Sequence, residues 1–148
     1  MKGLRSLKIR DIMTPNPYTI STDSTVKNAA DIMKKHDIGA IPIVDPENNR
    51  IKGIVTDRDI ILRCLSNDLD IYTTKAEEIM TENAITVCPD NSITESSRIM
   101  AKNKVRRLPV CENGKVIGMV SLGDISRSKL MFAETASAFC DICENETE

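Results

Sequence analysis

The sequence predicts a mixed α/β (α+β) fold built from two β-α-β-β-α repeats that pack about a pseudo-two-fold axis. One observation is an internal echo, in which Ile12-Met13-Thr14-Pro15-Asn16 returns 67 residues later as Ile79-Met80-Thr81-Glu82-Asn83. A second is that the offset falls to 65 before Gly53 pairs with Gly118, and the change lies in a turn, where hairpins tolerate length variation. A third is size. One copy of about 55 residues buries too little surface alone, so the two copies should pack face to face.

Each copy opens with a short strand and an amphipathic helix. The helix is predicted because apolar residues of the first copy recur at the i, i+3, i+4 and i+7 positions of one face, and the second copy has a counterpart of this segment. In the first copy, Asp23-Ser24 offers a cap for the start of this helix. The expected strands lie around Thr19-Ile20 and Thr86-Val87, and the helix faces are marked by Val26, Ala29, Ala30 and Met33 in one copy and by Ile93, Ser96, Ser97 and Met100 in the other.

Each copy continues with two apolar strands joined by a turn and closes with a second helix. This helix should begin at Thr56 or Ser121 and run to about Leu65 or Leu130. The expected strand pairs are Ile38 to Val44 with Ile51 to Val55, and Val105 to Cys111 with Val116 to Val120. The resulting organisation is a first repeat at 9–66, a linker at 67–75, a second repeat at 76–130, and a C-terminal helical extension with an acidic tail at 131–148.

Composition argues against several classes of protein. The formal net charge is −2 and there are no Trp, two Tyr and two Phe, whereas a nucleic-acid binder needs a basic face and stacking platforms. No run approaches 18 apolar residues, so we expect no membrane partner, and the charged first residues lack the apolar region of a signal peptide. The five cysteines form no disulfide-like framework, which suits a reducing compartment. We therefore expect a cytoplasmic protein.

The repeated motifs resemble a tandem pair of CBS domains, named after cystathionine β-synthase, from roughly Ile9 to Leu130. The motifs that carry the resemblance are Asp11-Ile12-Met13-Thr14, Gly39-Ala40-Ile41-Pro42-Ile43-Val44-Asp45 and Gly53-Ile54-Val55-Thr56-Asp57-Arg58-Asp59, echoed by Glu78-Ile79-Met80-Thr81, Val105-Arg106-Arg107-Leu108-Pro109-Val110 and Gly118-Met119-Val120-Ser121-Leu122-Gly123-Asp124. The resemblance implies two symmetry-related clefts, each able to hold an adenosine-bearing ligand such as AMP, ADP, ATP, NAD or S-adenosylmethionine. It also implies a homodimer and a regulated partner protein, which we expect to be a separate, unidentified chain.

The segments from Thr56 to Asp59 and from Ser121 to Asp124 have a chemical interpretation of their own. In each, a strand ends at a hydroxyl residue that starts a helix, and a carboxylate follows one turn along. A carboxylate is a natural acceptor for a ribose diol, and the free N–H groups of a helix start favour phosphate. The alternative is a capping box, in which the same side chains only satisfy the helix end.

Arg106-Arg107 is the sharpest difference between the copies, because the first copy has Gly39-Ala40 at the aligned positions. Guanidinium groups pair with phosphate oxygens in a bidentate manner, so we expect the cleft with Ser121, Asp124 and this arginine pair to be the better phosphate site. The alternative is a solvated charge pair or an interface salt bridge. Arg58 could serve either cleft, although the carboxylates beside it could equally neutralise it.

The resemblance further implies apolar walls around adenine, with residues near Tyr18 and Ile41 in one cleft and Ile85 and Leu108 in the other. No metal-binding residues are expected, although Mg²⁺ could accompany bound ATP. Asp57 and Asp59 are considered as metal ligands and set aside, because they lie at a helix start beside an arginine. The single CxxC of Cys140 and Cys143 lacks the second pair that a zinc site needs and the thioredoxin-like context of a redox motif.

No catalytic residue is expected, because the single histidine, His36, follows two lysines at a helix end and should be solvated. The sequence therefore favours a regulatory adenine-nucleotide sensor with no obligatory cofactor. The competing hypothesis is a structural module for dimerisation or partner docking whose clefts hold no physiological nucleotide. An enzyme is the third and weakest interpretation.

Overall fold

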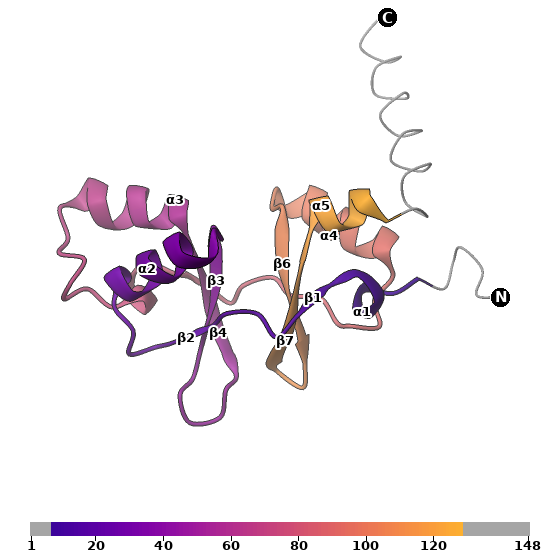
Figure 1. The fold of residues 1–148 in the computed structure, drawn as a ribbon, viewed down its shortest axis with the longest axis horizontal. Coiled ribbons are helices and arrows are strands. Elements are labelled where there is room, and N and C mark those ends of the chain that lie inside the picture. The colour runs from indigo at the N-terminus through magenta and orange to yellow at the C-terminus, as the bar shows by residue number, and fades with distance from the viewer. Residues whose placement is uncertain (1–6, 129–148) are drawn as a thin grey trace, which may run out of the picture.

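The structure, a computed structural model, describes residues 7–128 and contains two sheet-and-helix units that lie side by side (Figure 1). The predicted α/β fold with two repeated units is confirmed. The expected extension and acidic tail at 131–148, with Cys140 and Cys143, lie outside the described residues. The expected end of the last helix at Leu130 also lies beyond them.

Each unit contains one sheet, which includes the hairpin predicted for its repeat. Both hairpins are antiparallel, and each has a register irregularity at the same place, between Ile43 and Val44 and between Val110 and Cys111. In the first sheet, with order β2-β3-β4-β5, the strands are β2 (Ile20–Ser21), β3 (Ala40–Val44), β4 (Ile51–Thr56) and β5 (Thr81–Glu82). In the second, with order β1-β7-β6, they are β1 (Thr14–Pro15), β7 (Lys115–Ser121) and β6 (Arg107–Glu112).

Two amphipathic helices, α2 (Val26–His36) and α4 (Ile93–Asn103), occupy the predicted positions. The expected cap at Asp23-Ser24 is wrong, because Thr25 caps α2 by accepting a hydrogen bond from the backbone N–H of Asn28 at 3.1 Å. The helix begins at Val26, its first buried residue, so the hydroxyl immediately before it is the one in reach of the free N–H groups.

The second helix of each repeat starts directly after the predicted hydroxyl residue. It begins as α3 (Asp57–Asp59) in the first repeat, continues as π-helical turns at Ile60–Cys64 and closes with a 3₁₀ turn at Leu65–Asn67. Its counterpart is α5 (Leu122–Arg127). No helix within residues 7–128 is long and apolar enough to cross a membrane.

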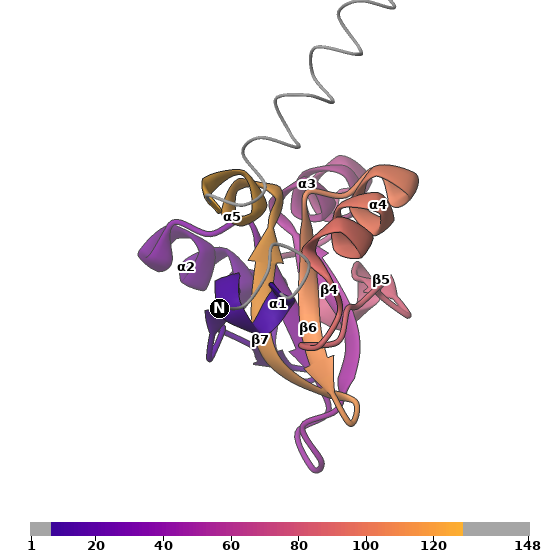
Figure 2. The same ribbon diagram turned by 90° about the vertical axis from the view of Figure 1, so that its right-hand side faces the viewer.

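The leading segments of the two repeats are exchanged between the units. The first repeat begins with α1 (Ile9–Ile12) and β1, and β1 pairs with β7 of the second repeat (Figures 1 and 2). In return, the second repeat begins with a 3₁₀ turn at Ala76–Glu78 and β5, and β5 pairs with β4 of the first. Each sheet is therefore completed by a strand from the other repeat.

The exchange also reaches the two hydrophobic cores. Ile9 is fully buried in the core of the second unit, beside Val87 and Val110. Ala76 and Ile79 are buried in the core of the first unit. Burying these side chains removes apolar surface from water, so each core depends on a segment contributed by the other repeat.

An exposed ion pair holds α1 against the second unit. Nε and Nη2 of Arg10 both donate to Oδ1 of Asp90, at 3.0 and 2.9 Å. This hydrogen bond lowers the pKa of the Asp90 carboxyl below its ordinary value of 3.8. A carboxyl whose pKa is lowered by folding stabilises the protein above its unfolded-state pKa, and the contribution is lost as the pH falls through the folded-state pKa.

We therefore expect Arg10→Ala to lower the urea midpoint slightly at pH 7, and the difference from the wild type to shrink as the pH falls below about 4. Urea unfolding at stepped pH measures this difference. Lys102→Ala is the matched control, because Lys102 is an exposed cation without an ion pair among the described residues. A difference for Arg10→Ala that stays constant down to low pH would show that the ion pair contributes nothing.

Candidate functional site

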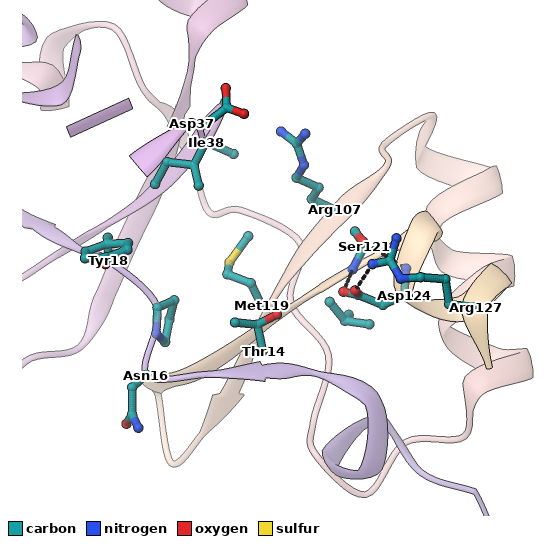
Figure 3. A pocket seen from close by; sticks show the side chains of 14 residues that line it. Thr14, Asn16, Tyr18, Asp37, Ile38, Arg107, Met119, Ser121, Asp124 and Arg127 are labelled. Atoms are coloured by element: carbon teal, nitrogen blue, oxygen red, sulfur yellow. Dashed lines mark hydrogen bonds and ion pairs between the residues drawn. The ribbon is translucent and has the colours of Figure 1, made fainter. Parts of the chain in front are cut away.

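Two cavities that contain the predicted helix starts combine side chains from both repeats. The larger, called the Thr56 cavity below, has a volume of about 680 Å³ and is lined by Thr56 and Asp59 together with the start of β6. The smaller, the Ser121 cavity, has a volume of about 440 Å³ and is lined by Ser121 and Asp124 together with the segment after β1 (Figure 3). Both volumes lie in the range of sites for small molecules and cofactors.

The hydroxyl and carboxylate side chains of each cavity form a reciprocal capping box. The N–H of Asp59 donates to Oγ1 of Thr56 at 3.1 Å, and the N–H of Thr56 donates back to Oδ2 of Asp59 at 2.9 Å. Ser121 and Asp124 repeat this arrangement at 3.0 and 2.8 Å. The capping alternative is thus real in both repeats, but it uses only one oxygen of each carboxylate.

The second carboxylate oxygens differ between the cavities. Oδ1 of Asp124 accepts a hydrogen bond from Nη2 of Arg127 at 2.7 Å, as Figure 3 shows. Oδ1 of Asp59 lies 3.7 Å from Nε of Arg63, which is a looser ion pair. A ribose diol would therefore meet a freer acceptor in the Thr56 cavity.

The two arginines of the second repeat do not both lie beside Ser121 and Asp124, as their positions in the sequence had predicted. Arg106 lines the Thr56 cavity and does not line the Ser121 cavity. Arg107 lines both cavities, and Figure 3 shows its side chain beside the Ser121 cavity. The expected grouping of both arginines with Ser121 and Asp124 is therefore wrong for Arg106.

The reason is that each cavity pairs the helix start of one repeat with the helix-to-strand loop of the other. The Thr56 cavity receives 104–109 from the second repeat, and the Ser121 cavity receives 37–40 from the first. Each loop leaves its helix through a left-handed residue, Asp37 with φ 53° or Lys104 with φ 55°. Asp37 adds a carboxylate to the Ser121 cavity, whereas Lys104 adds a cation to the Thr56 cavity.

Gly39 leaves room for the guanidinium of Arg107. A β carbon at Gly39 would lie 2.9 Å from Nη1 of Arg107 and 3.0 Å from Oδ2 of Asp57. Gly39 itself lines both cavities. The guanidinium of Arg107 from the second repeat thus occupies the space that a side chain at Gly39 of the first repeat would need.

The apolar side chains that the resemblance suggested are placed unequally. Ile85 and Leu108 both line the Thr56 cavity, and Tyr18 lines the Ser121 cavity. Ile41 lines neither cavity, because its side chain is fully buried in the core of the first unit. Tyr18 stacks on His36 with ring centroids 3.7 Å apart and an angle of 17°, so the histidine that was expected to be solvated ends its helix as predicted but is only partly exposed.

The remaining charges make the cavities electrostatically different. The Thr56 cavity is lined by Arg58, Lys104, Arg106 and Arg107 against the carboxylates of Asp57 and Asp59. The Ser121 cavity is lined by Arg107 and Arg127 against Asp37 and Asp124. Sequence reasoning missed Lys104 and Arg127. Arg127 has no arginine at the aligned position of the first repeat, which is Leu62, so the repeat gave no signal for it.

Comparison with known proteins agrees with this architecture. The family model described as "CBS domain" matches residues 9–66 and 76–130. The CBS domain-containing protein YhcV of Bacillus subtilis is 35% identical over 134 residues, which cover 90% of this chain and 94% of the relative.

Two solved structures share the fold. The CBS domain pair of protein MJ0100, solved in complex with 5'-methylthioadenosine and S-adenosyl-L-methionine, has a TM-score of 0.73 and 34% identity, covering 82% of this chain and 98% of that one. CBSX2 in complex with AMP has a TM-score of 0.72 and 25% identity, covering 85% and 98%. The family match spans most of the chain in two copies, and the chain therefore belongs to the CBS-domain family as a tandem pair of CBS domains.

Proposed function

We propose that the chain is a regulatory sensor that binds an adenine nucleotide, AMP, ADP or ATP, and acts on a separate partner protein. NAD and S-adenosylmethionine are further candidate ligands. The observation that carries the proposal is the Thr56 cavity, where the loosely paired Oδ1 of Asp59 and the cations of Arg106 and Arg107 line one space. Ribose hydroxyls and phosphate are the two groups that such side chains recognise. The MJ0100 and CBSX2 structures, which hold adenosine-bearing ligands, support the same class of ligand.

The Thr56 cavity is the proposed phosphate site. Four cations face two carboxylates there, against two of each in the Ser121 cavity. The Ser121 cavity instead offers the ring of Tyr18, which is half exposed and can stack on a base. A ribose there would compete with Arg127 for Oδ1 of Asp124, so we expect weaker binding in this cavity.

A specific observation also favours the alternative of a dimerisation or docking module. The helices after β4 and β7 carry exposed apolar side chains at Ile61, Leu62, Leu65 and Leu122. These helices, which begin as α3 and α5, lie on the same side of the molecule in Figures 1 and 2, and exposed apolar surface of this kind is typical of interaction sites. They support a homodimer, and they are compatible with nucleotide binding as well as with cavities that stay empty.

Calorimetric titration with AMP, ADP, ATP, NAD and S-adenosylmethionine tests the proposal, with ATP added both with and without Mg²⁺. We expect at least one of these ligands to bind more tightly than about 1 mM, which corresponds to about 4 kcal/mol. Asp59→Asn should weaken binding in the Thr56 cavity by roughly 10-fold or more, because it removes the charge while keeping an acceptor for the N–H of Thr56. Asp124→Asn is the matched variant for the other cavity.

Unfolding measurements separate the two roles of Asp59. Asp59→Ala should lower the free energy of unfolding by about 1 kcal/mol through the lost cap, whereas Asp59→Asn should lower it less. Unchanged affinity in Asp59→Asn, together with a stability loss in Asp59→Ala, would mean that the carboxylate is only a cap. Absence of binding by all five ligands would leave the dimerisation module as the better function.

A further inference from the structure

Cys88 and Cys111 lie on neighbouring parallel segments of the second unit. Val87 forms a parallel bridge with Val110, and its carbonyl accepts a hydrogen bond from the N–H of Cys111 at 2.9 Å. Each cysteine comes one residue after a bridge residue. In the first repeat the equivalent positions are Ser21 and Val44, which are register partners in β2 and β3.

The two thiols are expected on the same face of the sheet. Val87 and Val110 are buried in the core of the second unit, and successive residues of a strand point to opposite faces. Register partners on neighbouring strands are about 4.8 Å apart, within the range of about 4.4–6.8 Å that the Cα atoms of a disulfide span. Burial, and to a smaller extent the charge of the nearby Cys88 thiolate, raises the pKa of Cys111 to about 11.

The two thiols differ in exposure to solvent, and this difference gives them different roles in a thiol–disulfide exchange. Cys88 is exposed, so reagents in solution can reach it, whereas Cys111 is only 8% exposed. The remaining cysteine among the described residues, Cys64, is fully buried in the core of the first unit, where its thiol donates to the carbonyl of Leu69. Cys88 is therefore suited to attack first and Cys111 to resolve the product.

We propose that Cys88 and Cys111 are a thiol-modification site that closes into a reversible disulfide by exchange with a low-molecular-weight disulfide. The Cys88 thiolate attacks one sulfur of that disulfide, forms a mixed disulfide and releases one small thiolate. Cys111 then loses its proton to solvent and attacks Sγ of Cys88, which releases the second small thiolate. Two cysteine thiols are oxidised, and one small disulfide is reduced to two thiols.

The bond would join both walls of the Thr56 cavity. The segment that leads to Cys88 carries Asn83 and Ile85, and the strand that holds Cys111 carries Arg107 and Leu108, all of which line that cavity. Only one backbone bridge, at Val87 and Val110, joins these segments. A disulfide one residue further along would add a covalent link between them.

Glutathione disulfide is the probe that tests the site, with the Cys140→Ser/Cys143→Ser variant as the starting protein so that its CxxC cannot react. After incubation, alkylation in denaturant and peptide mapping, we expect the loss of two alkylatable thiols and a linked pair of peptides that contain Cys88 and Cys111. Dithiothreitol should restore both thiols.

The first repeat supplies the matched control, because Cys88→Ser with Cys111→Val installs the side chains that the fold already accepts at Ser21 and Val44. This variant should lose no thiol. Cys111→Val alone should stop at the mixed disulfide on Cys88, which identifies Cys111 as the resolving thiol. A stable mixed disulfide on Cys88 with Cys111 still free in the starting protein, or a link that joins two chains, would overturn the proposal.

Discussion

Gly53→Ala and Gly118→Ala are each expected to lower the free energy of unfolding by about 2–3 kcal/mol, because they overpack the places where the leading segments cross. A β carbon at Gly53 would lie 2.5 Å from the backbone oxygen of Thr81 and 2.6 Å from Sδ of Met80. The backbone oxygen cannot retreat without disturbing the pairing of β4 with β5. We expect the larger loss at this position.

Gly118 meets the equivalent segment of the first repeat. Its β carbon would lie 2.5 Å from Sδ of Met13 and 3.0 Å from the backbone oxygen of Thr14. The closest atom here belongs to a flexible side chain, which can move at a lower cost. Both variants therefore test the exchange of segments. A larger loss of unfolding free energy for Gly53→Ala than for Gly118→Ala would show that the contact with a backbone oxygen costs more than the contact with a flexible side chain.

Gly123→Ala is the control for these two variants. Gly123 lies inside α5, and the atom nearest to its added β carbon would be Nη1 of Arg127 at 3.3 Å, the end of an exposed side chain. Alanine favours a helix interior over glycine by about 0.5–1 kcal/mol, so this variant should be neutral or more stable. Chemical unfolding measures all three. Losses of equal size at the three positions would contradict the crossing contacts.

Much of the fold follows from the sequence because local patterns determine it. The hairpins, the amphipathic helices and the helix starts at Thr56 and Ser121 were predicted from apolar periodicity and from the repeat itself, and the structure confirms them. The exchange of leading segments was not predicted. A 67-residue offset shows that Thr14 and Thr81 are equivalent, but it contains no information about which unit each residue packs on.

The same limit explains the error at the site. Aligned position predicted that Arg106 would serve the helix start of its own repeat, whereas the packing of the units places it opposite Thr56. Ile41 shares a strand with the cavity-lining Ala40, but the alternation of the strand turns its side chain into the core. Contacts between repeats depend on docking geometry, and docking geometry leaves no periodic signal in one sequence.

Arg107→Ala is expected to weaken the binding of a phosphate-bearing adenine nucleotide in both cavities, by about 2 kcal/mol or roughly 30-fold in each. Its guanidinium lines both spaces, whereas Arg106 lines only the Thr56 cavity. Arg106→Gly should therefore weaken binding in the Thr56 cavity alone. Both replacements install the residue of the first repeat, Gly39 or Ala40, and both side chains are exposed, so stability should hardly change.

Calorimetry with AMP can measure each cavity separately when the other is disabled. Asp124→Ala leaves the Thr56 cavity to be measured, and Asp59→Ala leaves the Ser121 cavity. Titration with adenosine in the same proteins is the control, because a ligand without phosphate should be insensitive to either arginine. If Arg106→Gly weakened AMP binding only in the Ser121 cavity, the arginine would serve its own repeat after all. If both variants weakened adenosine as much as AMP, the arginines would shape the cavities without binding phosphate.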